Sequence, residues 1–182
     1  MFNIDIVRIC ILSYAFSSYA LAGLVVPYAL CFAGGIWVPK TIDTPAASTS
    51  PAAYVVDAGL VALFGLQHSL MARDWFKRML TRALPSCLER STYVLAASLA
   101  LCLLCWWWMP VTATVWVLEN RLLLWAAWAV FWIGCFVVYY ATFSIGHLEL
   151  LGLKSAVWYV RGEQPAAATF KVNGIYRSRV TR

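Results

Sequence analysis

The chain has 182 residues, of which 63% are hydrophobic and only 12% are charged, and its formal net charge at pH 7 is +6. Soluble domains usually carry about a quarter charged residues, and a single core of this size could not bury so much apolar surface. The composition therefore excludes an ordinary soluble domain and predicts an integral membrane protein.

Long continuous apolar runs predict that the chain crosses the bilayer as helices, because backbone groups at membrane depth must be paired internally. A transmembrane barrel would instead show short segments of alternating hydrophobicity. Each run is long enough for the roughly 20 residues that span a hydrocarbon core of about 30 Å. The runs cover residues 9–38, 52–72, 91–111 and 122–143. We predict an all-α, multi-pass transmembrane helical bundle of about four membrane helices, forming one domain over residues 1–182.

The first run begins after Arg8 and imitates a secretory signal peptide, with Ala20-Leu21-Ala22 as a small-residue site. A cleaved apolar region usually has only about 7–15 residues, whereas this run continues without interruption. We therefore expect it to stay as a membrane helix, in which Pro27 offers a place for a kink.

The second run contains polar side chains, which are costly at membrane depth and often functional. Asp57 lies close to the start of the run, where we favour a solvated acid at a helix N-terminus. His68 lies near the other end. Two interpretations stay open for it: a neutral imidazole hydrogen-bonded inside the bundle, or a functional group.

The connection at residues 73–90 is rich in basic residues, whereas the basic residues of the two connections on the opposite side are only Lys40 and Arg121. Because positive charge is retained on the cytoplasmic side, this asymmetry places both termini in the cytoplasm. The connection also predicts a short interfacial helix, interrupted at Pro85, with Trp75 facing lipid and Lys77 facing head groups. We expect membrane lipids as partners and no nucleic acid, because no nucleic-acid module accompanies the basic residues.

The third run ends in three consecutive tryptophans, Trp106, Trp107 and Trp108, which are typical of an interfacial belt. It also contains Cys102 and Cys105. Their spacing matches a redox motif, but the apolar context does not, and buried cysteine behaves as a small hydrophobe. We expect neither a disulfide framework nor a metal site.

The fourth run is followed by His147 and Glu149, which can orient each other where a helix leaves the membrane. Tyr140 would share a helix face with His147 if the helix continued. By the predicted topology, His68 and His147 lie at the same cytoplasmic level. Two histidines at one depth could ligate a haem, transfer protons or form hydrogen bonds, and the spacing does not choose among these.

Several stretches resemble the bacterial membrane-bound methanethiol S-methyltransferases, which are related to the NnrU and isoprenylcysteine carboxyl methyltransferase families. The resemblance extends from about residue 38 to residue 177. The stretches are Phe64-Gly65-Leu66-Gln67-His68-Ser69-Leu70-Met71-Ala72-Arg73, Leu88-Glu89-Arg90-Ser91-Thr92-Tyr93, His147-Leu148-Glu149-Leu150-Leu151-Gly152 and Gly174-Ile175-Tyr176-Arg177.

The resemblance implies methyl transfer from S-adenosylmethionine to methanethiol, giving dimethyl sulfide, in the bacterial inner membrane. It implies cofactor binding by Tyr176 and Arg177. In the family this segment continues into an Arg-His-Pro-x-Tyr motif and further helices, whereas this chain reads Ser178-Arg179-Val180-Thr181-Arg182. We therefore expect an incomplete copy that lacks the cofactor-binding part after residue 177.

Within this chemistry we expect His147 or His68 to accept the thiol proton, with Glu149 orienting it. Two alternatives to the enzyme stay open: an NnrU-like, non-enzymatic membrane accessory protein, and a haem subunit ligated by His68 and His147. The sequence does not indicate an oligomeric state.

Overall fold

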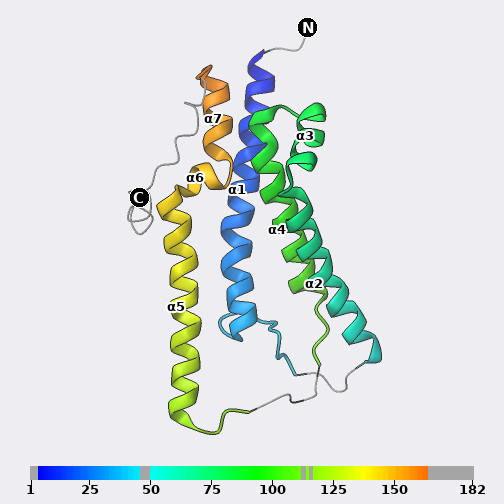
Figure 1. Cartoon of the computed structure of the whole chain (residues 1–182), viewed down its shortest axis with the longest axis vertical. Coiled ribbons are helices and arrows are strands. Elements are labelled where there is room, and N and C mark those ends of the chain that lie inside the picture. The colour runs from blue at the N-terminus through cyan, green and yellow to red at the C-terminus, as the bar shows by residue number, and fades with distance from the viewer. Residues whose placement is uncertain (1–3, 46–49, 112–113, 115–116, 164–182) are drawn as a thin grey trace, which may run out of the picture.

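The computed structural model describes residues 4–45, 50–111, 114 and 117–163. These residues form helices and contain no strand (Figure 1). Four helical segments are long and apolar enough to cross a membrane: Ile4–Gly34, Pro51–Met71, Ser86–Trp107 and Arg121–Ile145. The predicted all-α, multi-pass membrane architecture is confirmed.

Helix α1 (Ile4–Gly34) ends earlier than its apolar run, because the chain turns at Gly35 with φ +68°. Helix α2 (Pro51–Met71) starts with favourable local chemistry: Ser50 accepts a hydrogen bond from the Ala52 amide, and Pro51 occupies the first turn. Helix α5 (Arg121–Ile145) starts similarly, since Asn120 Oδ1 accepts from Leu122 N at 2.8 Å.

The predicted break at Pro85 separates helix α3 (Asp74–Ala83) from the short 3-10 helix η1 (Ser86–Leu88), which runs into α4 (Glu89–Trp107). The short helix that the sequence predicted in this connection is therefore present as α3, and its interfacial position stays a prediction. No residue of α3 is buried, and Trp75 is 52% exposed. Two further short helices, α6 (His147–Leu150) and α7 (Leu153–Arg161), were not expected from the sequence.

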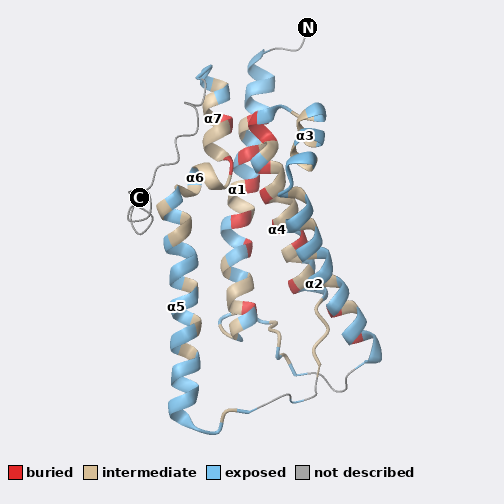
Figure 2. Ribbon diagram, viewed as in Figure 1, coloured by how far each residue is buried: buried red, intermediate tan, exposed pale blue. Residues whose placement is uncertain are grey.

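Helix α4 packs against α1 on one side and α2 on the other, so it lies between them in Figure 1. The buried core sits at the end of the bundle where η1 and α7 close over α1 (Figure 2). Its buried members are Ile11, Ala15, Cys87, Leu88 and Ala156. Helix α7 is thus part of the core, although it is only nine residues long.

Helix α5 stands apart from this core and has no buried residue (Figures 1 and 2). It approaches α1 where the two helices pass Gly34, since a Cβ built on that glycine would lie 2.8 Å from Phe131 Cζ. Just beyond, the rings of Trp37 and Trp132 lie 5.9 Å apart. Most of the α5 surface is therefore not covered by the other described helices.

Asp57 is not the solvated acid that its place near the start of the second run suggested. It lies beyond the first turn of α2, is only 7% exposed, and accepts a hydrogen bond from Met109 N at 2.8 Å. The expectation was wrong because the end of α4 covers this position. Asp57 therefore joins α2 to the segment that follows α4.

Candidate functional site

The polar end of the fourth membrane helix is shaped by Gly146, whose φ of +99° ends α5 and starts α6 in a new direction. Glycine adopts such a φ without steric cost. Because the helix does not continue, Tyr140 does not take the place beside His147 that an unbroken helix would give it. Phe143 contacts the His147 ring instead, with centroids 4.7 Å apart.

His147 is half-buried and pairs with Tyr19, which comes from the middle of α1. Tyr19 Oη lies 3.0 Å from His147 Nδ1, and the two ring centroids are 6.0 Å apart. The sequence did not single out Tyr19, because a tyrosine inside an apolar run carries no signal of its own. Its role depends on a partner 128 residues away.

Glu149 does not take the orienting place beside His147 that the sequence suggested. Its Oε2 accepts from Lys154 Nζ at 3.0 Å, and the same ammonium lies 4.4 Å from the centroid of the Trp158 ring. The α6–α7 turn brings Lys154 to Glu149, and Tyr19 is the residue that hydrogen-bonds to His147.

His68 on α2 is exposed and pairs with Tyr93 of α4. Tyr93 Oη lies 2.9 Å from Nε2 and 3.0 Å from Nδ1. Phe64, one helical turn earlier, stacks on the imidazole with centroids 5.6 Å apart. A hydrogen-bonded imidazole is therefore present at His68, and the functional interpretation of this residue stays a prediction.

The two histidines lie on opposite sides of the central α1–α4 pair, one on α2 and one on α6 (Figure 1). Each is held by its own tyrosine from that pair. Among the described residues, no hydrogen bond or ring contact joins the two imidazoles, and no cluster of three metal-ligating side chains is found. The arrangement therefore provides two separate tyrosine–histidine pairs and does not resemble two axial ligands facing one iron.

A cleft of about 380 Å³ lies between α1 and α5, and we call it the α1–α5 cleft. Its walls are apolar and aromatic and carry no charged side chain. Its lining includes Pro27, Leu30 and Cys31 from α1, and Cys135, Phe136 and Tyr139 from α5. The aromatic residues Trp37, Phe131 and Trp132 line the end that is farther from His147.

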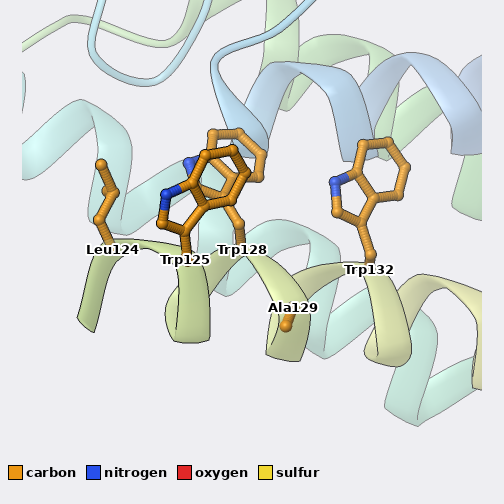
Figure 3. A pocket seen from close by; sticks show the side chains of 5 residues that line it. All are labelled: Leu124, Trp125, Trp128, Ala129 and Trp132. Atoms are coloured by element: carbon orange, nitrogen blue, oxygen red, sulfur yellow. The ribbon is translucent and has the colours of Figure 1, made fainter. Parts of the chain in front are cut away.

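A second hollow of similar volume lies on α5 itself. All five residues that line it belong to that helix, and its three tryptophan rings stand on the same side (Figure 3). Among the described residues, no second element lines this hollow, so it is a groove on the surface of α5. The α1–α5 cleft is the better candidate for a binding site, since two helices form its walls.

The chain is similar to several curated methanethiol S-methyltransferases. It is 40% identical to that of Mycobacterium tuberculosis over 164 residues, which cover 90% of this chain and 67% of the relative. It is 36% identical to that of Crocosphaera subtropica over 170 residues, which cover 93% of this chain and 67% of the relative. The chain thus spans about two thirds of the length of these relatives.

A more distant similarity connects the chain with Nurim of Bos taurus, at 38% identity over 116 residues, which cover 59% of this chain and 43% of Nurim. No protein-family model matches the chain, and no solved structure matches it.

Proposed function

The chain belongs to the methanethiol S-methyltransferase family, and we propose on that premise that it methylates the sulfur of methanethiol to give dimethyl sulfide. The observation that carries the proposal is the sequence identity to enzymes of that name over about nine tenths of the chain. The separation of the two histidines supports this proposal over the haem alternative, because axial ligands must meet at one iron.

We propose S-adenosylmethionine as the methyl donor, which supplies an electrophilic methyl group on a sulfonium. The two hollows described above do not fit this molecule, because both lack charged side chains to pair with its amine and carboxylate. Tyr176 and Arg177, which the family resemblance assigns to the cofactor, lie outside the described residues.

Methanethiol must lose its proton to react, because the thiolate is the nucleophile. The His147–Tyr19 pair suits this task. When His147 Nδ1–H donates to Tyr19 Oη, Nε2 keeps its lone pair and can accept the thiol proton. Within the described part of the chain, no side chain occupies Nε2. Phe143 lies beside the imidazole, with the two ring planes tilted by 59°.

Glu149 has a more distant role in this proposal than the sequence suggested. Its ion pair with Lys154 joins α6 to α7, and so supports the short helix that carries His147. We place this end of the bundle at the cytoplasmic face of a bacterial inner membrane, because the basic connection between α2 and α4 lies at the same end (Figure 1).

The proposal is tested with membranes from cells that express the chain, incubated with methanethiol and S-adenosylmethionine carrying a deuterated methyl group. We expect dimethyl sulfide with one deuterated methyl in the headspace, measured by gas chromatography and mass spectrometry. Membranes with the relative from Mycobacterium tuberculosis serve as the positive control. If the control forms labelled dimethyl sulfide and this chain forms none, the activity does not belong to these 182 residues.

A further inference from the structure

We propose that the α1–α5 cleft admits short-chain alkanethiols from the lipid and guides them toward the His147–Tyr19 pair. This inference rests on the proposed function and names the route and the class of its acceptor. The cleft would separate the two substrates by solubility, since a small thiol dissolves in lipid and a charged methyl donor does not.

The two walls of the cleft meet at both of its ends. At one end, Gly34 allows α1 to approach Phe131, and Trp37 contacts Trp132. At the other end, Tyr19 and His147 join α1 to the segment that follows α5. Between these contacts the helices are apart, and this separation creates the cleft.

On both α1 and α5, one end of the cleft lining is directed toward the His147–Tyr19 pair. Pro27 is the lining residue of α1 nearest in sequence to Tyr19, and Tyr139 is the one of α5 nearest to His147. Pro27 is about two helical turns, or roughly 12 Å, away from Tyr19 along α1, and Tyr139 is separated from His147 by the last turns of α5 and the turn at Gly146. The cleft therefore points toward the group that we propose to accept the thiol proton, and a thiol leaves the end of the cleft to reach it.

The lining suits a small apolar sulfur compound. Aromatic edges and sulfur atoms make favourable contacts, and apolar walls exclude an ion that has no partner. Cys31 and Cys135 face the cleft from opposite walls and are partly exposed. A volume of about 380 Å³ exceeds that of methanethiol, so thiols with a few more carbons should also enter. The partly exposed lining is open to the bilayer, which supplies such molecules.

The accessibility of the cleft is measured with methyl methanethiosulfonate, which delivers a CH3S group of the size of the acceptor. A cysteine thiolate attacks the reagent, methanesulfinate leaves, and a cysteine–S–S–CH3 disulfide forms. Cys102 is the matched control, because it is also partly exposed and lies in a membrane helix, but it does not line the cleft. Variants that retain Cys31, Cys135 or Cys102 as their single cysteine are compared by mass spectrometry.

We expect Cys31 and Cys135 to react faster than Cys102. We also expect dimethyl sulfide, which cannot react with a thiol, to protect the two cleft cysteines. Protection should reach about tenfold when its concentration is about ten times its dissociation constant, with no protection of Cys102. Equal rates at all three positions, or a lack of protection, would overturn the proposal. Slow modification of both cleft cysteines would indicate that a lipid chain fills the cleft, and it would also overturn the proposal.

A kinetic comparison connects the cleft to turnover. Cys135→Phe fills the cleft and should raise KM for methanethiol by roughly tenfold with a smaller change in kcat, because it removes binding space for one substrate. Val137→Phe adds the same ring on an exposed part of α5 outside the lining and should leave KM unchanged. Equal KM values for both variants would contradict the inference. An inactive chain would refute the proposed function. The proposal for the cleft would still be tested by the labelling experiment, because protection of the cysteines requires no turnover.

Discussion

At the scale of single residues, each histidine is bound by a tyrosine from the central helix pair, but the two contacts differ. Tyr93 Oη is nearly equidistant from both nitrogens of His68, at 2.9 and 3.0 Å, so it does not select one of them. Tyr19 bonds a single nitrogen of His147. Since a base needs one defined free nitrogen, His147 is the better candidate for accepting the thiol proton.

We predict that His147→Ala lowers kcat for dimethyl sulfide formation by about 100-fold or more, the usual loss when a general base is removed. Tyr19→Phe should lower kcat by a smaller factor, because the imidazole remains but loses the hydrogen bond that orients it. The measurement is steady-state kinetics in membranes at matched protein levels. In a His147→Ala background, Tyr19→Phe should have no further effect, as expected for residues that act together.

The second tyrosine–histidine pair is the matched control for this prediction. Tyr93→Phe removes the same kind of hydrogen bond from His68 on α2, and we expect it to have less effect than Tyr19→Phe. If His68→Ala abolished the activity and His147→Ala did not, the proton acceptor would be on α2.

At the scale of the elements, the end of α4 is held by one group from α2 and one from the connection that follows α1. Asp57 of α2 accepts from Met109 N, and Lys40, which follows α1, donates to the carbonyl oxygen of Trp106. A cation near the last carbonyls of a helix is favourable. The second carboxylate oxygen of Asp57 is buried and has no partner in the described residues. The contact of Asp57 with the end of α4 therefore depends on Oδ1 alone in the described residues.

We predict that Asp57→Ala lowers the stability of the protein in detergent by about 1–3 kcal/mol, because a buried amide loses its acceptor. Asp57→Asn keeps an acceptor oxygen and replaces the unpartnered one, so it should be close to neutral. Thermal unfolding followed by circular dichroism measures both variants. Equal destabilisation by the two substitutions would show that the charge, and not the hydrogen bond, matters.

The turn between α6 and α7 depends on a close approach of Gly152 to the start of α4. A Cβ on Gly152 would lie 2.6 Å from Ser91 N, and its φ is +88°. We predict that Gly152→Ala costs more than the roughly 1–3 kcal/mol of backbone strain alone, because α7 must also move away from α4. Gly162→Ala is the control, since its φ is +71° and nothing lies within 4 Å. Similar melting temperatures for both variants would contradict this explanation.

At the scale of the whole molecule, the four membrane helices place the α2–α4 connection, α6 and α7 at one end of the bundle (Figure 1). This end contains both histidines and the basic residues of α3. A soluble, charged methyl donor can reach it only from the aqueous side. The orientation in the membrane therefore decides whether the proposed chemistry has access to its donor.

We predict that a single cysteine at Thr81 on α3 is labelled by a membrane-impermeant maleimide only after the cytoplasmic side is opened. A single cysteine at Thr44, in the connection at the opposite end, should be labelled in intact cells. Both variants carry alanine in place of the native cysteines. The reverse pattern would put the histidines on the outer side and remove their access to a cytosolic donor.

Much of the fold was predictable because it depends on local properties of the chain. The apolar runs located the four membrane helices, and Pro85 located the end of α3. The helices α6 and α7 were missed because each is short and starts after a glycine with positive φ. The sequence predicts Glu149 as the partner of His147 because the two are close in the chain, whereas the structure shows Tyr19 in that role. Proximity in sequence is a poor guide to contact where the chain turns sharply.

By itself, the sequence determined that this is a membrane protein of apolar helices and related it to a family, since hydrophobicity and motifs are carried by neighbouring residues. Only the tertiary structure decided that Tyr19 meets His147, that Asp57 is buried against the segment after α4, and that a cleft separates α1 from α5. These features join residues far apart in the chain. They depend on how whole helices pack, which no local pattern specifies.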